Sequence, residues 1–176
     1  MPILCVLTLA ALPASVRAYP PEFHQLALTA FRRPMPAPTF DVATPNGALL
    51  RLADYRGRVV LLSFWATWCP PCIREMPSLE RLHQSLQGRG LVVLAVSLDR
   101  EGAVTVLPFV QRLALTFPVA LDPEGRVGAL YGAADLPSTF LIDRQGRVVA
   151  AAKGGRDWFS PQARSYVEEL LAAGGS

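Results

Sequence analysis

The chain has 176 residues, of which 51% are hydrophobic and 18% are charged, and its formal net charge is +3. This length and apolar content suit one globular domain with a substantial core and exclude a disordered chain. The basic residues are scattered without a run of like charges, so the composition does not indicate nucleic-acid binding.

The first 18 residues resemble a secretory signal peptide. Residues 2–16 carry no charge and are mostly apolar, and Val16-Arg17-Ala18 resembles a small-residue cleavage site. The apolar run is shorter than the ~20 residues of a spanning helix, and Pro13 interrupts it. We expect export and cleavage after Ala18, with an uncleaved membrane anchor as the alternative.

Residues 19–38 are rich in proline and contain one short apolar patch, which indicates a linker with one or two turns of helix. The folded domain is therefore expected to cover residues 39–173. At its start, residues 39–42 and 48–52 flank the turn-forming Pro45-Asn46-Gly47, a pattern that predicts a β-hairpin.

A strand, a helix and a second strand follow. The apolar run at 58–66 is typical of a strand buried on both faces, and 70–87 has helical periodicity. Pro77 lies beyond the first turn of that helix and is expected to kink it. Residues 91–97 form another apolar run, so the three elements predict a right-handed parallel βαβ unit.

The second half of the chain alternates short helices and strands. They are expected at 103–114 (helix), 117–121 (strand), 127–131 (helical turns), 138–142 and 147–152 (a strand pair joined by Asp143-Arg144-Gln145-Gly146) and from Ser160-Pro161 onward (helix).

The sequence Cys69-Pro70-Pro71-Cys72 places two thiols where the predicted helix begins, close enough to form a disulfide with each other. The positive end of a helix stabilises a thiolate, so we predict that an exposed Cys69 is the nucleophile. Cys72, turned inward, would resolve the mixed disulfide. Pro70 and Pro71 have no N–H group, so the first backbone donor available to the Cys69 sulfur is that of Cys72.

Two other interpretations of the cysteine pair remain open. A zinc site needs two further ligands, and the mature chain offers only His24, in the linker, and His83, expected on the polar side of the helix. A purely structural disulfide would close a very short loop and stabilise the fold little. Redox exchange is favoured, with no metal and no cofactor beyond the Cys69–Cys72 disulfide.

The residues around the cysteines also carry a family resemblance. Phe64-Trp65-Ala66-Thr67-Trp68-Cys69-Pro70-Pro71-Cys72-Ile73-Arg74-Glu75-Met76-Pro77, followed by Leu136-Pro137-Ser138-Thr139-Phe140-Leu141-Ile142-Asp143, resembles the TlpA/ResA/DsbE-type thioredoxin-like proteins of the bacterial envelope. The resemblance implies an α/β thioredoxin fold, a central mixed β-sheet flanked by helices, here with the N-terminal hairpin as an extension. It also implies that the Leu136-Pro137 bond is cis and faces the dithiol.

Glu75 follows Cys72 by three residues and therefore lies on the same helical face. A carboxylate there could take the thiol proton or raise its pKa by repulsion, and the resemblance supports such a role. Cytoplasmic thioredoxins carry a buried Asp where this chain has Ser63. The alternative is a solvated acid paired with Arg74 or Arg81.

The expected substrate-binding surface combines the aromatic residue before Cys69, the two prolines between the cysteines and the two residues whose peptide bond the resemblance implies to be cis. The resemblance implies that the backbone of Leu136 pairs with an extended substrate peptide. The alternative for the aromatic residue is that its ring packs within the protein and does not contact a substrate. The residues assigned to this surface are Trp68, Pro70, Pro71, Leu136 and Pro137.

Three further residues are given structural roles. Trp65 lies in the apolar strand and is expected in the core, while Trp158 is expected to pack at the sheet edge. Asp99, where a strand ends, is interpreted as a cap.

The resulting hypothesis is an exported thiol-disulfide oxidoreductase that reduces disulfides in envelope proteins, in cytochrome c maturation or at copper-site thiols. Its partners would be protein thiols and a membrane electron donor of the DsbD/CcdA type. A peroxiredoxin-type peroxidase and a non-catalytic thioredoxin-fold binding module are the alternatives.

Overall fold

The computed structural model describes residues 28–173. The predicted signal peptide at 1–18 and the first part of the predicted linker lie outside these residues. Within the described part of the chain, no helix is long and apolar enough to cross a membrane.

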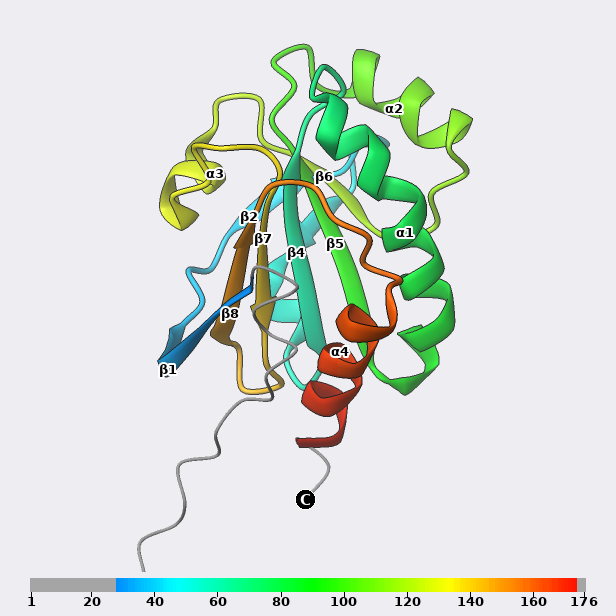
Figure 1. Ribbon diagram of the computed structural model, residues 1–176. Coiled ribbons are helices and arrows are strands. Elements are labelled where there is room, and N and C mark those ends of the chain that lie inside the picture. Colours follow the sequence, from blue (N-terminus) through cyan, green and yellow to red (C-terminus); the bar gives the residue numbers. More distant parts are fainter. Residues whose placement is uncertain (1–27, 174–176) are drawn as a thin grey trace, which may run out of the picture.

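A six-stranded mixed sheet in the order β1-β8-β7-β4-β5-β6 forms the centre of the fold (Figure 1). β4 and β5 are parallel, as are β5 and β6, whereas β7 runs antiparallel to both β4 and β8. This arrangement confirms the predicted βαβ unit and the mixed sheet. The strands are Leu28–Pro36 (β1), Val59–Trp65 (β4), Leu91–Ser97 (β5), Val119–Leu121 (β6), Ser138–Ile142 (β7) and Arg147–Lys153 (β8).

The helices cover both faces of this sheet, with α1 and α4 side by side in front of it in the view of Figure 1. α1 continues past Pro77, which lies inside the helix. The helices are Pro70–Leu86 (α1), Ala103–Arg112 (α2), Arg126–Tyr131 (α3) and Pro161–Ala173 (α4).

β4 contributes to two separate cores because successive side chains of a strand point to opposite faces. Leu61 and Trp65 pack with buried residues of α1, α2 and α4. Leu62 and Phe64 pack instead with residues of the N-terminal hairpin and α3. Burial on both faces explains why this strand is a continuous apolar run in the sequence.

The predicted N-terminal hairpin is confirmed. β2 (Asp41–Ala43) and β3 (Leu49–Arg51) pair antiparallel as a separate two-stranded sheet. Gly47 has φ +83° in the turn between them, a conformation that glycine adopts without strain. A 3₁₀ turn, η2 (Leu52–Tyr55), then leads toward β4.

The predicted linker is wrong for its second half, and the folded domain begins earlier than residue 39. Residues 28–36 form β1, which pairs with β8 from Leu28 opposite Ala152 to Pro36 opposite Arg147. β1 is an edge strand, and an edge strand tolerates proline because one side of its backbone needs no partner. Its pairing is also irregular between Ala30 and Met35, so the residues carry no regular alternation.

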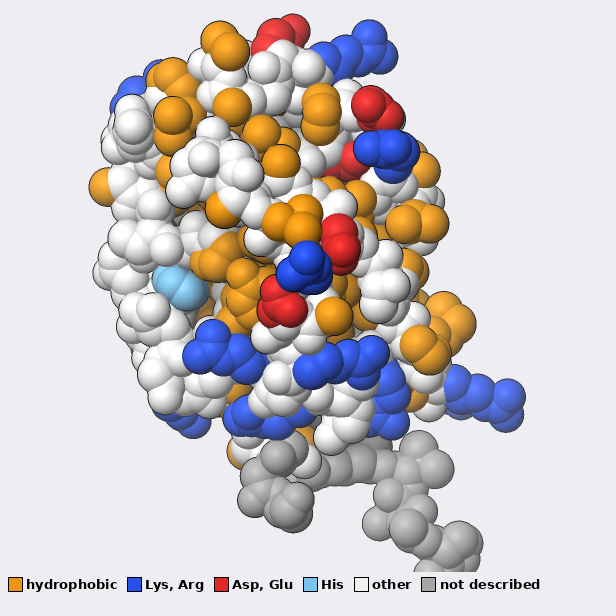
Figure 2. Space-filling model, turned by 180° about the vertical axis from the view of Figure 1, so that it is seen from behind, with side chains coloured by type: hydrophobic (Ala, Val, Ile, Leu, Met, Phe, Trp, Pro, Cys, Tyr) orange, Lys and Arg blue, Asp and Glu red, His pale blue; other side chains and the backbone are white. Residues whose placement is uncertain are grey.

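Lys and Arg side chains gather toward the lower end of the rear face, away from the start of α1 (Figure 2). At this end Arg144 donates to the carbonyl oxygens of Gly57 (2.8 Å) and Leu171 (3.2 Å), and Arg147 pairs with Asp143 at 2.7 Å. These contacts stabilise the loops at this end of the sheet.

Candidate active site

Cys69 and Cys72 form a disulfide at the start of α1, with their Cα atoms 5.3 Å apart. Cys69 has the extended backbone of a helix cap, and its sulfur accepts a hydrogen bond from the Cys72 N–H at 3.3 Å. Pro70 and Pro71 occupy the first two helical positions. The Cys72 N–H is therefore the first backbone donor that reaches the Cys69 sulfur, as the sequence predicted.

Both cysteines are less accessible than the sequence suggested. Cys69 keeps 4% of its surface exposed and Cys72 keeps none. The order is as expected, with Cys69 outside and Cys72 inside, but the prediction of an exposed Cys69 is wrong for the disulfide form. Pro70, by contrast, is exposed and Pro71 half-buried at the surface above them.

The Leu136-Pro137 peptide bond is cis, as the family resemblance implied. It precedes β7, whose residue Ser138 is paired with Phe64 of β4. Since β4 leads directly to Cys69, the cis bond lies at the same end of the sheet as the disulfide. Leu136 is half-buried and Pro137 is buried.

Glu75 is buried, with 2% of its surface exposed, so the alternative of a solvated acid paired with Arg74 or Arg81 is wrong. Its Oε1 accepts from the Ser63 hydroxyl at 3.4 Å, and its Oε2 accepts from the Arg156 N–H at 3.3 Å. Burial raises the pKa of Glu75 to about 7, and the Arg156 N–H and charge, Trp158 and Ser63 lower it in part. Near neutral pH this carboxyl can therefore either hold or accept a proton.

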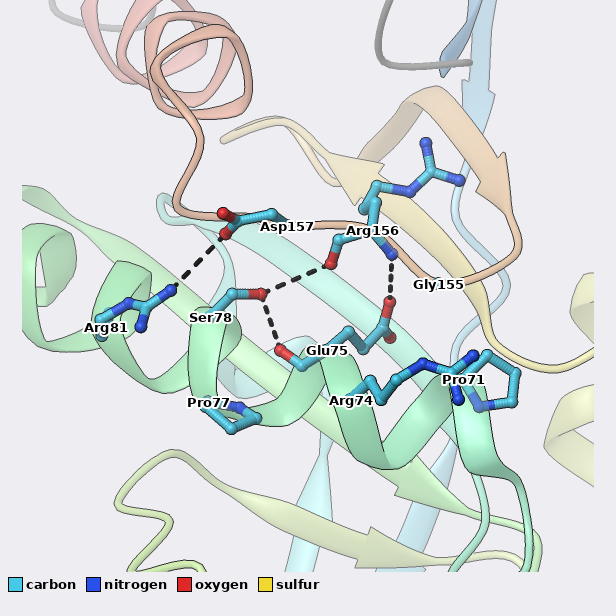
Figure 3. Close-up of a pocket in the computed structure, with 9 residues that line it drawn as sticks. All are labelled: Pro71, Arg74, Glu75, Pro77, Ser78, Arg81, Gly155, Arg156 and Asp157. Carbon is cyan, nitrogen blue, oxygen red and sulfur yellow. Dashed lines mark hydrogen bonds and ion pairs between the residues drawn. The ribbon is translucent and has the colours of Figure 1, made fainter.

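A pocket of about 430 Å³ lies between α1 and the loop that follows β8 (Figure 3). Pro71 and Glu75 line it from the helix, and Gly155 and Arg156 line it from the loop. Farther along, Arg81 forms an ion pair with Asp157 at 3.7 Å. Glu75 therefore borders the pocket although only 2% of its surface is exposed.

Asp99 is a further buried carboxylate, and it holds the turn that precedes Cys69. It accepts hydrogen bonds from the Thr67 N–H (3.0 Å), the Thr67 hydroxyl (2.6 Å) and the Ser97 hydroxyl (2.7 Å). The sequence indicated only a cap at the end of a strand. Its contact with Thr67 was missed because it joins positions that are 32 residues apart.

Trp68 is 65% exposed, which contradicts the packing alternative and leaves its ring available at the surface beside Cys69. Trp65 is fully buried in the core, as predicted, with its ring centroid 5.0 Å from that of Phe109. His83 is buried against Phe117, so its expected place on the polar side of the helix is wrong.

The sheet order, the disulfide at a helix start and the cis-proline at the same end define a thioredoxin-like thiol-disulfide oxidoreductase. Residues 35–151 match the model of the AhpC/TSA family, and the chain belongs to that family. Within it, the chain is a thiol-disulfide oxidoreductase of the TlpA/ResA/DsbE type, whose substrates are protein thiols and disulfides.

Named relatives support this placement. The chain is 38% identical over 135 residues to the thiol-disulfide oxidoreductase ResA of Bacillus thuringiensis subsp. konkukian, covering 77% of this chain and 74% of that protein. It is 45% identical over 112 residues to ResA of Geobacillus thermodenitrificans, covering 64% of each. A crystal structure from Chlorobium tepidum, assigned as the thiol:disulfide interchange protein DsbE, superposes with a TM-score of 0.70 at 33% identity, covering 81% of this chain and 96% of that one.

Proposed function

We propose that the protein reduces disulfides in exported proteins through the Cys69/Cys72 dithiol. The observation that carries the proposal is the disulfide at the start of α1, in which the outer sulfur, that of Cys69, accepts the Cys72 N–H. A thiolate at that position would gain the same hydrogen bond together with the favourable field of the helix end.

In the reduced protein, the Cys69 thiolate attacks one sulfur of the substrate disulfide and the other substrate sulfur leaves as a thiolate. Cys72 then loses its proton and attacks the Cys69 sulfur, which releases the second substrate sulfur and forms the Cys69–Cys72 disulfide. Two electrons pass from the protein to the substrate. The two substrate thiolates take up two protons, one that Cys72 releases by way of Glu75 and one from solvent.

Glu75 is the proposed acceptor for the Cys72 proton, because it is buried one helical turn farther along and has a pKa of about 7. Trp68, Pro70 and Pro71 would contact the substrate on one side of the disulfide. Leu136 and Pro137 would contact it on the other, with the Leu136 backbone pairing to an extended peptide.

We further propose that the protein acts outside the cytoplasm after export by its N-terminal segment, on apocytochrome thiols or copper-site cysteines, and that a membrane dithiol donor of the DsbD/CcdA type recycles it. The test is to express a Cys72→Ser variant in the envelope and identify the proteins trapped on Cys69. Trapped cytochrome or copper-site proteins support the substrate class, whereas recovery of cytoplasmic proteins alone contradicts it.

The direction of exchange needs a separate measurement, because a Cys-x-x-Cys sequence does not fix its own reduction potential. A reduction potential of the Cys69/Cys72 pair close to that of strong oxidants would contradict the assignment as a reductase. The alternative from the sequence is a peroxiredoxin-type peroxidase, so peroxide turnover is the relevant comparison. Negligible peroxide consumption by the reduced protein would exclude the peroxidase function.

A further inference from the structure

Three consecutive residues in the loop after β8 each contact a different part of the site. The contacts are the Gly154 N–H to the Pro137 oxygen at 2.9 Å, Gly155 packed against Pro71, and the Arg156 N–H to Glu75 Oε2 at 3.3 Å. Figure 3 shows Gly155 beside Pro71 and the Arg156 backbone nitrogen directed at Glu75. The loop therefore joins the cis-proline, the start of α1 and the buried carboxyl.

Gly155 has no room for a side chain. A Cβ atom there would lie 2.8 Å from the backbone oxygen of Pro71 and 3.2 Å from its Cβ atom. That oxygen belongs to the first turn of α1 and cannot rotate away as a flexible side chain could. Gly155 does not have the positive φ that favours glycine, so the requirement at this position is one of space.

A side chain at Gly155 would change the surroundings of Glu75. Relieving the contact needs a separation of roughly half an ångström between the loop and α1. The Arg156 N–H, one residue farther on, is already at the long end of hydrogen-bond distances and would no longer reach the carboxylate. A gap of this size is too narrow for water, so Glu75 would lose a donor and stay buried.

We propose that Gly155 is a positioning residue of the active site: because it has no side chain, the loop lies against Pro71 and holds the Arg156 N–H on the Glu75 carboxylate. The loop thereby sets how readily Glu75 gives up its proton. The catalytic consequence rests on the proposed function, but the effect on Glu75 does not.

The other groups around Glu75 come from three elements. β4 supplies Ser63, α1 supplies Arg74, Ser78 and Arg81, and the loop supplies Arg156, Asp157 and Trp158. Arg156 also donates through its guanidinium to the Lys153 and Gly154 oxygens, at 2.7 and 3.0 Å. Both of these contacts lie within the loop, so they do not fix the distance between the Arg156 N–H and Glu75.

The test is the pKa of the Glu75 carboxyl in the oxidised full-length protein, measured by ¹³C NMR, with Glu75→Gln identifying the signal. The Cys69–Cys72 disulfide removes thiol titration from the same pH range. In Gly155→Ala we expect the pKa of Glu75 to rise by about one unit, a tenfold higher proton affinity. The matched control is Gly88→Ala, since a Cβ at Gly88 meets nothing within 4 Å, and it should leave the pKa unchanged.

An unchanged or lowered pKa of Glu75 in folded Gly155→Ala would overturn the proposal. If Gly155→Ala does not fold, the wild-type protein supplies the decision, because the Arg156 backbone amide resonance must titrate with the same midpoint as Glu75. An amide that does not respond overturns the proposal. Neither readout requires exchange activity, so an inactive protein with a responsive Glu75 would reject only the proposed function.

Discussion

Ser63 and Glu75 meet across the interface between β4 and α1, where the Ser63 hydroxyl donates to Glu75 Oε1 at 3.4 Å. Both side chains are buried, and the nearby positive charge of Arg156 lowers the pKa of Glu75. The Glu75 carboxyl lies on α1, the helix that also carries Cys72. Burial raises the pKa of Glu75, and the Arg156 N–H, Trp158, the Arg156 charge and the Ser63 hydroxyl lower it in part.

The first prediction concerns stability against pH in the oxidised protein. Glu75 has a pKa of about 7 when folded and about 4.5 when unfolded, so between these values the folded protein holds a proton that the unfolded chain has released. The free energy of unfolding must then fall as pH rises through this window, by at most about 3 kcal/mol. Glu75→Gln should lose this slope and be the more stable protein above pH 7, as measured by urea unfolding. An equal slope in both proteins would reject the assigned pKa.

The second prediction concerns Cys72 in the reduced protein. An ionised Glu75 one helical turn away disfavours the Cys72 thiolate, so Glu75→Gln should lower the pKa of Cys72 by roughly one unit. Thiol titration by absorbance or by the rate of alkylation measures it. Glu101→Gln, an exposed acid in the loop before α2, is the control. Superimposable curves for wild type and Glu75→Gln would remove Glu75 from the mechanism.

A third prediction follows from the contact between Asp99 and Thr67. Asp99→Asn removes an acceptor from a buried network and should cost about 2 kcal/mol of stability, while Thr67→Val removes only the hydroxyl and should cost about 1 kcal/mol. Because the two residues share these bonds, the double variant should lose less than the sum. Strict additivity in a denaturation cycle would show that the contact contributes nothing.

Much of this arrangement could be predicted from the sequence because its signals are local. The apolar runs of β4 and β5 and the helical periodicity between them predicted the βαβ unit. The cis bond at Pro137 was predicted from the family resemblance of the motif around it. β1 was missed because its prolines and arginines suit an edge strand and a linker equally well. The contacts of Arg156 with Glu75 and of Asp99 with Thr67 join distant positions, so no sequence window contains them.

The fourth prediction separates docking from chemistry at Trp68. Its side chain is largely exposed, so Trp68→Ala should change the free energy of unfolding by less than about 0.5 kcal/mol. Reduction of a protein disulfide should slow several-fold through a higher KM, while reduction of a small aromatic disulfide keeps its rate. Leu130→Ala, at another exposed apolar site on α3, should change neither rate. A slower reaction with the small disulfide would place Trp68 in the chemistry instead.

The most direct test of the account is to mix each reduced single-cysteine variant with a disulfide-bonded peptide and follow the products by mass spectrometry. Cys72→Ser should accumulate a mixed disulfide between Cys69 and the peptide, because nothing resolves it. Cys69→Ser should form almost none, because Cys72 is fully buried. Faster trapping on Cys72 than on Cys69 would contradict the assignment of Cys69 as nucleophile and, with it, the proposed mechanism.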